Sequence, residues 1–335
     1  MSKRRGKQTV FFDNPPIIRE TGTVAGEKEG EGPISDCFDL IAEDILFGEK
    51  TWEKAESKFA KTAVNLALKK ANLKPEDVDY ILGGDLINQC TGTTYGIRDY
   101  GIPYVGLYGA CSTMALSMSM ASICIDGGFA QRCLAVTSSH FCSAEKQFRF
   151  PLEYGGQRPP SAQWTVTGSA CAVLEKGTSG IKIEGITTGK IIDNGINDAN
   201  NMGAAMSPAA ADTLITHFND TGRKPSDYDL ILSGDLGFVG KSILVDILNK
   251  KGFDVSNNYN DCGLIIFDRE NQDVHAGGSG CACAGLTFCG YIFKLLKEKK
   301  INNVLFMATG ALQSTLSIQQ GESIPGIAHA IAIHS

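Results

Sequence analysis

The feature that most constrains the fold of this chain is a stretch that it contains twice. Residues 74–86 read KPEDVDYILGGDL, and residues 224–236 read KPSDYDLILSGDL. Apolar residues recur at helical spacing before each copy, in TWEKAESKFAKTAVNLALKKANL and in SPAAADTLITHFNDTG. Each copy is therefore predicted to be an amphipathic helix, a turn and a short apolar strand (80–82 and 230–232) that ends in a Gly-Asp loop.

The similarity continues after each copy. The first is followed by YGACSTMALSMSMASICIDGGFAQRCLAVTSS and the second by GSGCACAGLTFCGYIFKLLKEKKINNVLFMATGA. Both read as a turn of small residues, a helix and a buried strand, and the first helix is apolar almost all round, so it must be covered on every side. The chain is predicted to be an α/β protein of two duplicated halves, residues 1–185 and 186–335, whose sheets enclose central helices. No G-x-G-x-x-G follows a predicted strand, which argues against dinucleotide binding.

Composition excludes several classes of function. The 335 residues are 43% hydrophobic and carry a net charge of −6 with both signs interspersed, which argues against nucleic-acid binding. The odd number of cysteines, 11, predicts free thiols in a reducing compartment. The chain shows neither a signal peptide nor an apolar run long enough to span a bilayer, so we expect it to be soluble and intracellular. The basic cluster 3–7 is interpreted as a solvated terminus, with an anionic membrane surface as the alternative.

Residues 106–128, GLYGACSTMALSMSMASICIDGG, resemble the nucleophile region of the thiolase superfamily. In that superfamily a cysteine stands at the N-terminal tip of a buried helix, and Cys111 occupies the corresponding position. Residues 162–176 and 326–333 are similar to the strands that close each half. The resemblance implies a five-layer αβαβα fold and a homodimer that pairs through the edge of the first-half sheet.

Three segments, GTVAGEKEGEGPISDCFD, GEKTWEKAESK and RPPSAQWTVTGSACAVLEK, resemble more closely the stage V sporulation protein AD family of spore-forming bacteria. This resemblance implies a non-enzymatic binding protein for dipicolinic acid, taken alone or as its calcium complex, which supports uptake into the developing spore. It also implies membrane proteins of the same sporulation operon as partners, peripheral association with the spore inner membrane, and no cofactor.

The chemistry of Cys111 has two interpretations. A thiol at a helix N-terminus can have a lowered pKa, so one interpretation is that Cys111 forms a thiolate, and the other is that it is simply a small buried residue. Condensing relatives also need a histidine and an asparagine as donors, and the sequence places Gly234 and Gly277 or Gly278 at those positions. We therefore expect binding without turnover. A cysteine-dependent acyltransferase or condensing enzyme that uses Cys111 is the alternative.

The ligand is expected at the tip of the first central helix. Backbone N–H groups at Ala110 to Ser112 are predicted to receive a carboxylate, near Cys111, Asp85 and His329. Asp85 ends its strand as its counterpart in the second repeat does, and each of the two either caps the next turn or coordinates calcium.

Other candidates are weaker. The counterpart of Asp85 is Asp235, whose role stays open. His140 lies near the expected pocket, and Arg149 or Arg158 is a candidate partner for a second carboxylate. The spacing of Cys281, Cys283 and Cys289 differs from that of structural zinc sites, so no metal site is predicted.

Overall fold

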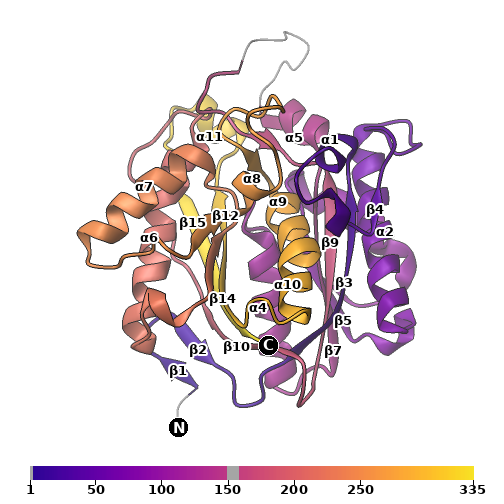
Figure 1. The fold of residues 1–335 in the computed structure, drawn as a ribbon. Helices are drawn as coiled ribbons and strands as arrows, with labels where there is room; N and C mark the ends of the chain where they lie inside the picture. Colours follow the sequence, from indigo (N-terminus) through magenta and orange to yellow (C-terminus); the bar gives the residue numbers. More distant parts are fainter. Residues whose placement is uncertain (1–2, 149–157) are drawn as a thin grey trace.

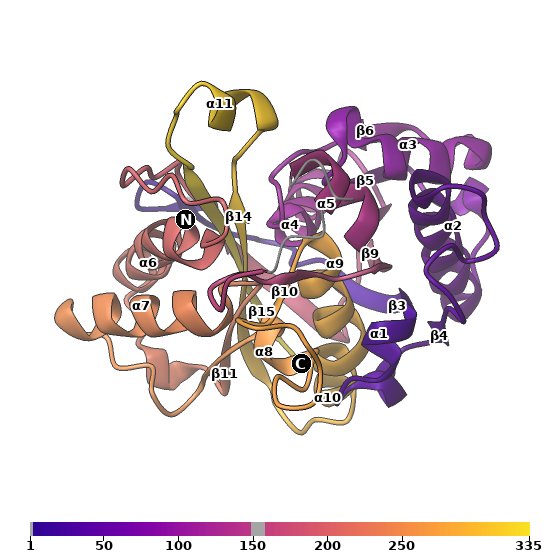
Figure 2. The same ribbon diagram turned by 90° about the horizontal axis from the view of Figure 1, so that it is seen from above.

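A computed structural model describes residues 3–148 and 158–335. It consists of five layers: α2 and α3, a sheet, the central helices α4 and α9–α10, a second sheet, and α6 with α7 (Figures 1 and 2). The helices are α1 Glu27–Gly30, α2 Trp52–Ala71, α3 Thr91–Ile97, α4 Thr113–Asp126, α5 Phe141–Phe148, α6 Met202–Thr221, α7 Gly237–Lys250, α8 Cys262–Ile265, α9 Cys281–Leu286, α10 Phe293–Lys297 and α11 Thr315–Gln319, with a π-helical turn at Thr287–Ile292 between α9 and α10. The five-layer αβαβα fold expected from the sequence is confirmed.

The strands form two rows with the same internal order. The first row is β3-β9-β7-β5-β6 and the second is β10-β15-β14-β11-β12, and antiparallel pairing of β3 with β10 joins them. The strands are β1 Arg4–Arg5, β2 Thr9–Phe11, β3 Ile17–Ala25, β4 Leu40–Ile41, β5 Tyr80–Gly84, β6 Tyr104–Gly106, β7 Arg132–Ser139, β8 Trp164–Thr165, β9 Gly168–Glu175, β10 Ile181–Thr187, β11 Leu230–Ser233, β12 Tyr259–Asp261, β13 Gly278–Ser279, β14 Asn303–Ala311 and β15 Gly326–His334. The predicted strands at 80–82 and 230–232 are β5 and β11, one in each row.

The repeated stretch makes the same contacts in both halves. Asp77 and Asp227 each accept a hydrogen bond, 2.8 Å long, from the backbone N–H three residues earlier and so close a short 3₁₀ turn. Asp79 accepts from the N–H of Arg132 at the start of β7, and Asp229 accepts from the N–H of Asn303 at the start of β14. Both copies therefore connect an outer helix to a strand and hold the start of the neighbouring strand.

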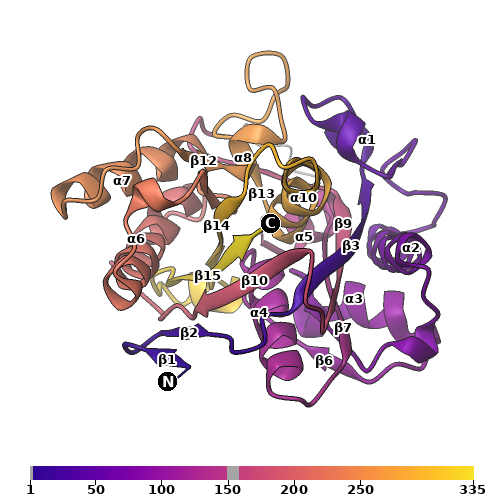
Figure 3. The same ribbon diagram turned by 60° about the horizontal axis from the view of Figure 1, so that its bottom comes forward.

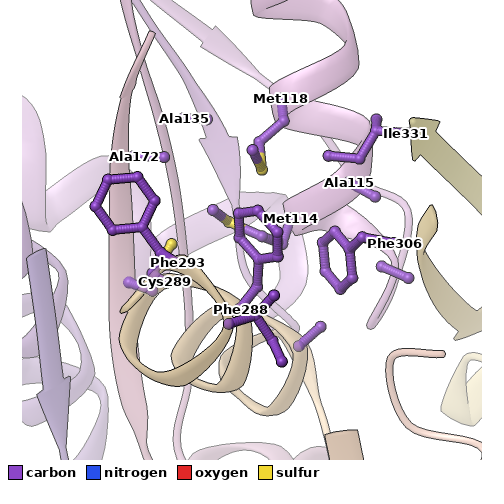
Figure 4. Packing of buried hydrophobic residues seen from close by; sticks show 14 of the residues in the cluster. Met114, Ala115, Met118, Ala135, Ala172, Phe288, Cys289, Phe293, Phe306 and Ile331 are labelled. Atoms are coloured by element: carbon purple, nitrogen blue, oxygen red, sulfur yellow. The ribbon is translucent and has the colours of Figure 1, made fainter. Parts of the chain in front are cut away.

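The central helices are buried on all sides. Met114 and Met118 of α4 are fully buried and pack near Phe288, from the turn after α9, and Phe306 of β14 (Figure 4). Burying one such side chain completely contributes about 1.5–3 kcal/mol. The nearly uniform apolar character of 113–126, which predicted a covered helix, follows from this position between the two sheets.

The boundary expected after residue 185 falls inside β10. This strand pairs with β15 along Lys182–Thr187 and with β3 at Ile181 and Lys182. It is the first strand of the second row, as β3 is the first strand of the first row. The N-terminal strand β2 also pairs with β10, so the start of the chain lies against the second half. Over the described ranges 3–148 and 158–335, no helix combines the length and apolarity that a bilayer span requires.

Candidate ligand-binding site

Cys111 lies in a tight turn immediately before α4. Ala110 has a φ of 48°, in the left-handed region that few non-glycine residues adopt. Its carbonyl oxygen accepts hydrogen bonds from the Thr113 hydroxyl, at 2.6 Å, and from the Cys281 thiol, at 3.1 Å. These contacts hold the strained turn and connect the starts of the two central helices.

The second half supplies polar side chains beside this thiol. The Ser279 hydroxyl lies 3.9 Å from the Cys111 sulfur and donates to the Asp235 carboxylate at 2.9 Å. Asp235, fully buried at the end of β11, also accepts from the Thr309 hydroxyl at 2.7 Å and from the N–H of Gly280 at 3.0 Å. A thiol, a serine and a buried carboxylate therefore form one connected network.

The thiolate interpretation of Cys111 is not supported by this environment. Burial raises the pKa of the Cys111 thiol well above its usual range, and the negative charge of Asp235 raises that pKa further. Burial also raises the pKa of Asp235, and hydrogen bonds from Thr309 and Cys111 oppose that increase. Desolvation and a neighbouring carboxylate oppose the field of the helix N-terminus, so this environment favours the neutral thiol, the second of the two interpretations of Cys111.

Residues adjacent to the two predicted glycine positions fill the space around the sulfur. Gly234 packs against β14, where an added Cβ would lie 3.0 Å from the Ala308 Cα. The next residue is Asp235, and Ser279 directly follows Gly278. Asp235 and Ser279, the residues that follow these glycines, therefore lie beside Cys111.

A small cavity opens next to Cys111. Its volume is about 30 Å³, enough to hold one or two water molecules. Both halves contribute to its wall, which includes Tyr108, Glu145, Phe148, Thr165, Met202 and Gln313. Glu145 is buried and accepts a hydrogen bond from the Thr165 hydroxyl at 3.2 Å.

Two of the five predicted ligand residues line this cavity, Ala110 and Cys111. Ser112 lies outside its lining and is fully buried, and both its hydroxyl and its N–H donate to the carbonyl oxygen of Gly109, at 2.6 and 3.0 Å. The Ser112 N–H is therefore already satisfied within the turn. This geometry argues against its predicted role as a carboxylate donor.

Asp85 and His329 also lie outside the cavity lining. The Asp85 carboxylate accepts from the N–H groups of Ile87, at 2.9 Å, and Thr93, at 2.7 Å, so it caps the turn after β5 and the start of α3. His329 accepts from the N–H of Gly189 at 3.2 Å, and burial lowers its pKa to about 4. Both side chains therefore serve local backbone structure.

The weaker candidates are also placed by their contacts. His140 is buried, with its Nε2 2.7 Å from the Ile45 carbonyl oxygen. Arg158 lies over the Trp164 ring at 5.1 Å, outside the cavity lining, and Arg149 falls outside the described residues.

The cysteines of α9 point to backbone oxygens. The Cys283 thiol donates to the carbonyl of Gly234 at 3.4 Å, as Cys281 does to that of Ala110. Cys289 is buried in the main hydrophobic core. Within the part of the chain that the structure describes, no three His, Cys, Asp or Glu residues cluster closely enough to hold a metal ion.

Several residues of the site were not identified from the sequence. Ser279 could have been inferred from its position directly after the glycine pair, and the role of Asp235 was left open. Glu145 and Gln313 gave no local signal, because the sequence of a short polar helix or loop does not reveal that a charged side chain becomes buried, as Glu145 does, or that an amide lines a cavity, as Gln313 does.

Comparisons with known proteins agree with this architecture. Residues 6–334 match the family model of stage V sporulation protein AD (SpoVAD). The chain is 48% identical over 329 residues to stage V sporulation protein AD of Bacillus subtilis (strain 168), an alignment that covers 98% of this chain and 97% of the relative.

Solved structures show the same fold at low identity. Among them is 3-oxoacyl-(acyl-carrier-protein) synthase III of Aquifex aeolicus VF5, with a TM-score of 0.57, 13% identity and coverage of 96% of this chain and 100% of that one. Another is OleA of Xanthomonas campestris, with a TM-score of 0.62, 12% identity and coverage of 96% and 97%. The thiolase-like fold is thus shared with these synthases, and the chain belongs to the stage V sporulation protein AD family.

Proposed function

We propose that this protein is a non-enzymatic binding protein for dipicolinic acid, taken as its calcium complex, and that it supports uptake of this molecule into the developing spore. Membership of a family named for sporulation supports the setting. The membrane proteins encoded with it are its expected partners. The cavity beside Cys111 is the proposed binding site.

The observation that carries the proposal is the carboxylate beside the thiol. Acyl transfer by a cysteine needs a thiolate and hydrogen-bond donors where negative charge develops. Asp235 instead places a negative charge next to Cys111, which favours the neutral thiol. Such a site supports recognition better than it supports catalysis.

The charges around the cavity favour the calcium complex over the free acid. Glu145 lines the cavity and Asp235 lies beside Cys111, so two buried carboxyl groups are close to where a ligand with two carboxylates would bind. Calcium bound to dipicolinate neutralises those carboxylates and still accepts further oxygen ligands, because Ca²⁺ takes six to eight in all. The Glu145 carboxylate is suited to supply one of them.

Binding requires the cavity to widen. A volume of about 30 Å³ accommodates a water molecule, whereas dipicolinate has about twelve non-hydrogen atoms. Phe148, Met202 and Gln313 form part of the wall, and each of these long side chains has alternative rotamers. We propose that the ligand displaces these side chains on entry.

Titration calorimetry with dipicolinate, in the presence and absence of calcium, tests the proposal. Saturable binding in calcium that weakens at least tenfold in Glu145→Gln is the expected result. The matched control is Glu53→Gln, a glutamate on α2 outside the cavity lining, which should leave binding unchanged. Absence of binding in calcium, or equal binding by both variants, would contradict the assignment of the site.

Mass spectrometry separates this proposal from the acyltransferase alternative. After incubation with acetyl-CoA or malonyl thioesters, Cys111 should carry no acyl group. An acyl adduct on Cys111 that is then transferred to a second substrate would establish an enzyme instead.

A further inference from the structure

A buried carboxyl group with an unpaired oxygen lies outside the network beside Cys111. It belongs to Glu29 in α1, the short helix that directly follows the end of β3 (Figure 3). The residue is 1% exposed, and its Oε1 accepts a hydrogen bond from the N–H of Thr167 at 2.9 Å. Its Oε2 is buried and has no hydrogen-bond partner within residues 3–148 and 158–335. A buried polar atom of this kind costs free energy unless a ligand or water satisfies it.

A glycine allows this carboxyl group to lie where it does. A Cβ atom added to Gly26 would lie 2.5 Å from the Glu29 Oε2 and 3.0 Å from the Thr167 Cβ. The backbone N–H of Gly26 also donates to the Thr167 carbonyl oxygen, at 2.8 Å. The carboxyl group is therefore held closely between α1 and the residues before β9, with one oxygen left unpaired.

Glu29 lines a cavity of about 70 Å³, enough for a few water molecules or one small polar group. The rings of Phe141 and Trp164 form an aromatic wall, stacked with their centroids 3.8 Å apart and their planes 10° apart. The exposed residues Glu27 and Ile45 also line the cavity, so it lies close to the surface. Its wall thus combines an aromatic surface with a carboxyl group.

The charges around this cavity favour a cation. Glu27, Lys28 and Glu29 are the charged residues that line it, so two negative charges face one positive charge when Glu29 is ionised. The Lys28 Nζ lies 4.3 Å from the centroid of the Trp164 ring, which shows that this ring accepts an ammonium group. One further cation would neutralise the lining and pair with the free oxygen.

Other charged groups near Glu29 also affect binding. Burial raises the pKa of Glu29 to about 7, the charge of Glu31 raises it further, and the Thr167 hydrogen bond and the charge of Lys28 oppose the increase. Arg158 lies over the Trp164 ring at 5.1 Å, outside the cavity lining. Burial lowers the pKa of His140, which favours the neutral ring. A cation should therefore bind best above pH 7, where Glu29 is ionised.

We propose that this cavity binds a primary ammonium group, as carried by a small amine or by a lysine side chain. The ammonium group donates to the Glu29 Oε2 and lies against the aromatic wall. A single free oxygen suits it better than a guanidinium group, which pairs through two parallel N–H groups. Lys28 competes for the same wall from within the chain. Among the described residues this lining shares no member with that of the cavity beside Cys111, so the inference does not depend on dipicolinate.

Tryptophan fluorescence of Trp52→Phe tests this proposal, because Trp164 is then the only tryptophan in the chain. At pH 8 and constant ionic strength, n-propylammonium chloride should change the fluorescence saturably, with a Kd on the order of 1 mM for so small a ligand. Sodium chloride and 1-propanol should cause no saturable change. The affinity should fall about tenfold between pH 8 and pH 6, because Glu29, with a pKa of about 7, becomes protonated.

Three variants in the same background assign the contacts. Glu29→Gln should lower the affinity at least tenfold at pH 8 and should remove its pH dependence. Lys28→Ala removes the competing ammonium group and should raise the affinity severalfold. The matched control is Glu43→Gln, which changes an exposed glutamate outside the lining and should stay within twofold of the parent.

Two further measurements complete the test. Nα-acetyl-lysinamide separates the sources of the ligand: its binding assigns the site to a lysine side chain of a partner protein, and binding of propylammonium alone assigns it to a free amine. Thermal unfolding with propylammonium gives a readout that does not depend on fluorescence. A parent that shows neither a fluorescence change nor a gain in thermal stability would overturn the proposal and leave a cavity that holds only water. Folded Glu29→Gln that binds as tightly as the parent would overturn it too.

Discussion

Replacing Asp235 by asparagine should make Cys111 more reactive. Asparagine keeps the shape of the side chain and removes its negative charge. Its carbonyl oxygen can still accept from Ser279 and Gly280, while its NH₂ group faces the Thr309 hydroxyl, which can accept as well as donate. The variant is therefore expected to fold.

The size of the effect follows from the charge beside the sulfur. Cys111 and Asp235 each affect the pKa of the other, and for scale two unit charges about 4 Å apart repel by about 4 kcal/mol at an effective dielectric constant of about 20. That figure is an upper bound, because water and neighbouring dipoles rearrange. Burial, the largest cause of the raised pKa of Cys111, is unchanged in the variant. We therefore expect alkylation of Cys111 at pH 8 to accelerate at least tenfold without reaching the rate of a free thiol.

The assay is the rate of iodoacetamide labelling at Cys111, followed by peptide mass spectrometry between pH 6 and 10. The matched control is Asp85→Asn, which changes the equivalent aspartate of the first repeat and should leave the Cys111 rate unchanged. An unaltered rate in folded Asp235→Asn, or equal acceleration by both variants, would refute the claim that Asp235 keeps this thiol protonated.

Three further predictions concern stability and assembly. Burial raises the pKa of Glu29 from 4.5 to about 7, so between these pH values the unfolded state loses a proton that the folded state keeps. The free energy of unfolding should therefore fall as pH rises from about 4.5 to 7, and urea denaturation of Glu29→Gln should show a fall that is smaller by about 3 kcal/mol. Tyr228→Phe should lower the free energy of unfolding by about 1–3 kcal/mol, because His217 Nε2 loses its partner at 2.5 Å; an unchanged calorimetric transition would contradict this. Val105, 40% exposed on the edge strand β6, should lie in the expected homodimer interface, so sedimentation velocity should show a dimer for the parent and a monomer for Val105→Lys.

The architecture could be predicted because its signals are local and occur twice. Helical spacing in α2 and α6, and the Lys-Pro turns that follow, depend on neighbouring residues alone. The uniform apolar character of α4 likewise required burial between layers. These patterns are enough to indicate a duplicated α/β sandwich.

The site could not be predicted to the same extent, because it depends on which residues the two halves bring together. Asp85 and Asp235 end equivalent strands in nearly identical sequence. Asp85 caps a local turn, whereas Asp235 meets Ser279 and Thr309 from distant segments and lies beside Cys111. Local sequence also suggested a reactive thiol at a helix start. The burial that raises the pKa of this thiol is a property of the assembled fold, so the sequence alone does not reveal it.

A crystal structure of the protein grown with calcium and dipicolinate tests the central claim most directly. The account predicts the ligand next to the Cys111 thiol, with the Glu145 carboxylate on the calcium ion and with Phe148, Met202 or Gln313 displaced from its present position. Saturating ligand bound elsewhere, with the cavity still closed at about 30 Å³, would contradict it.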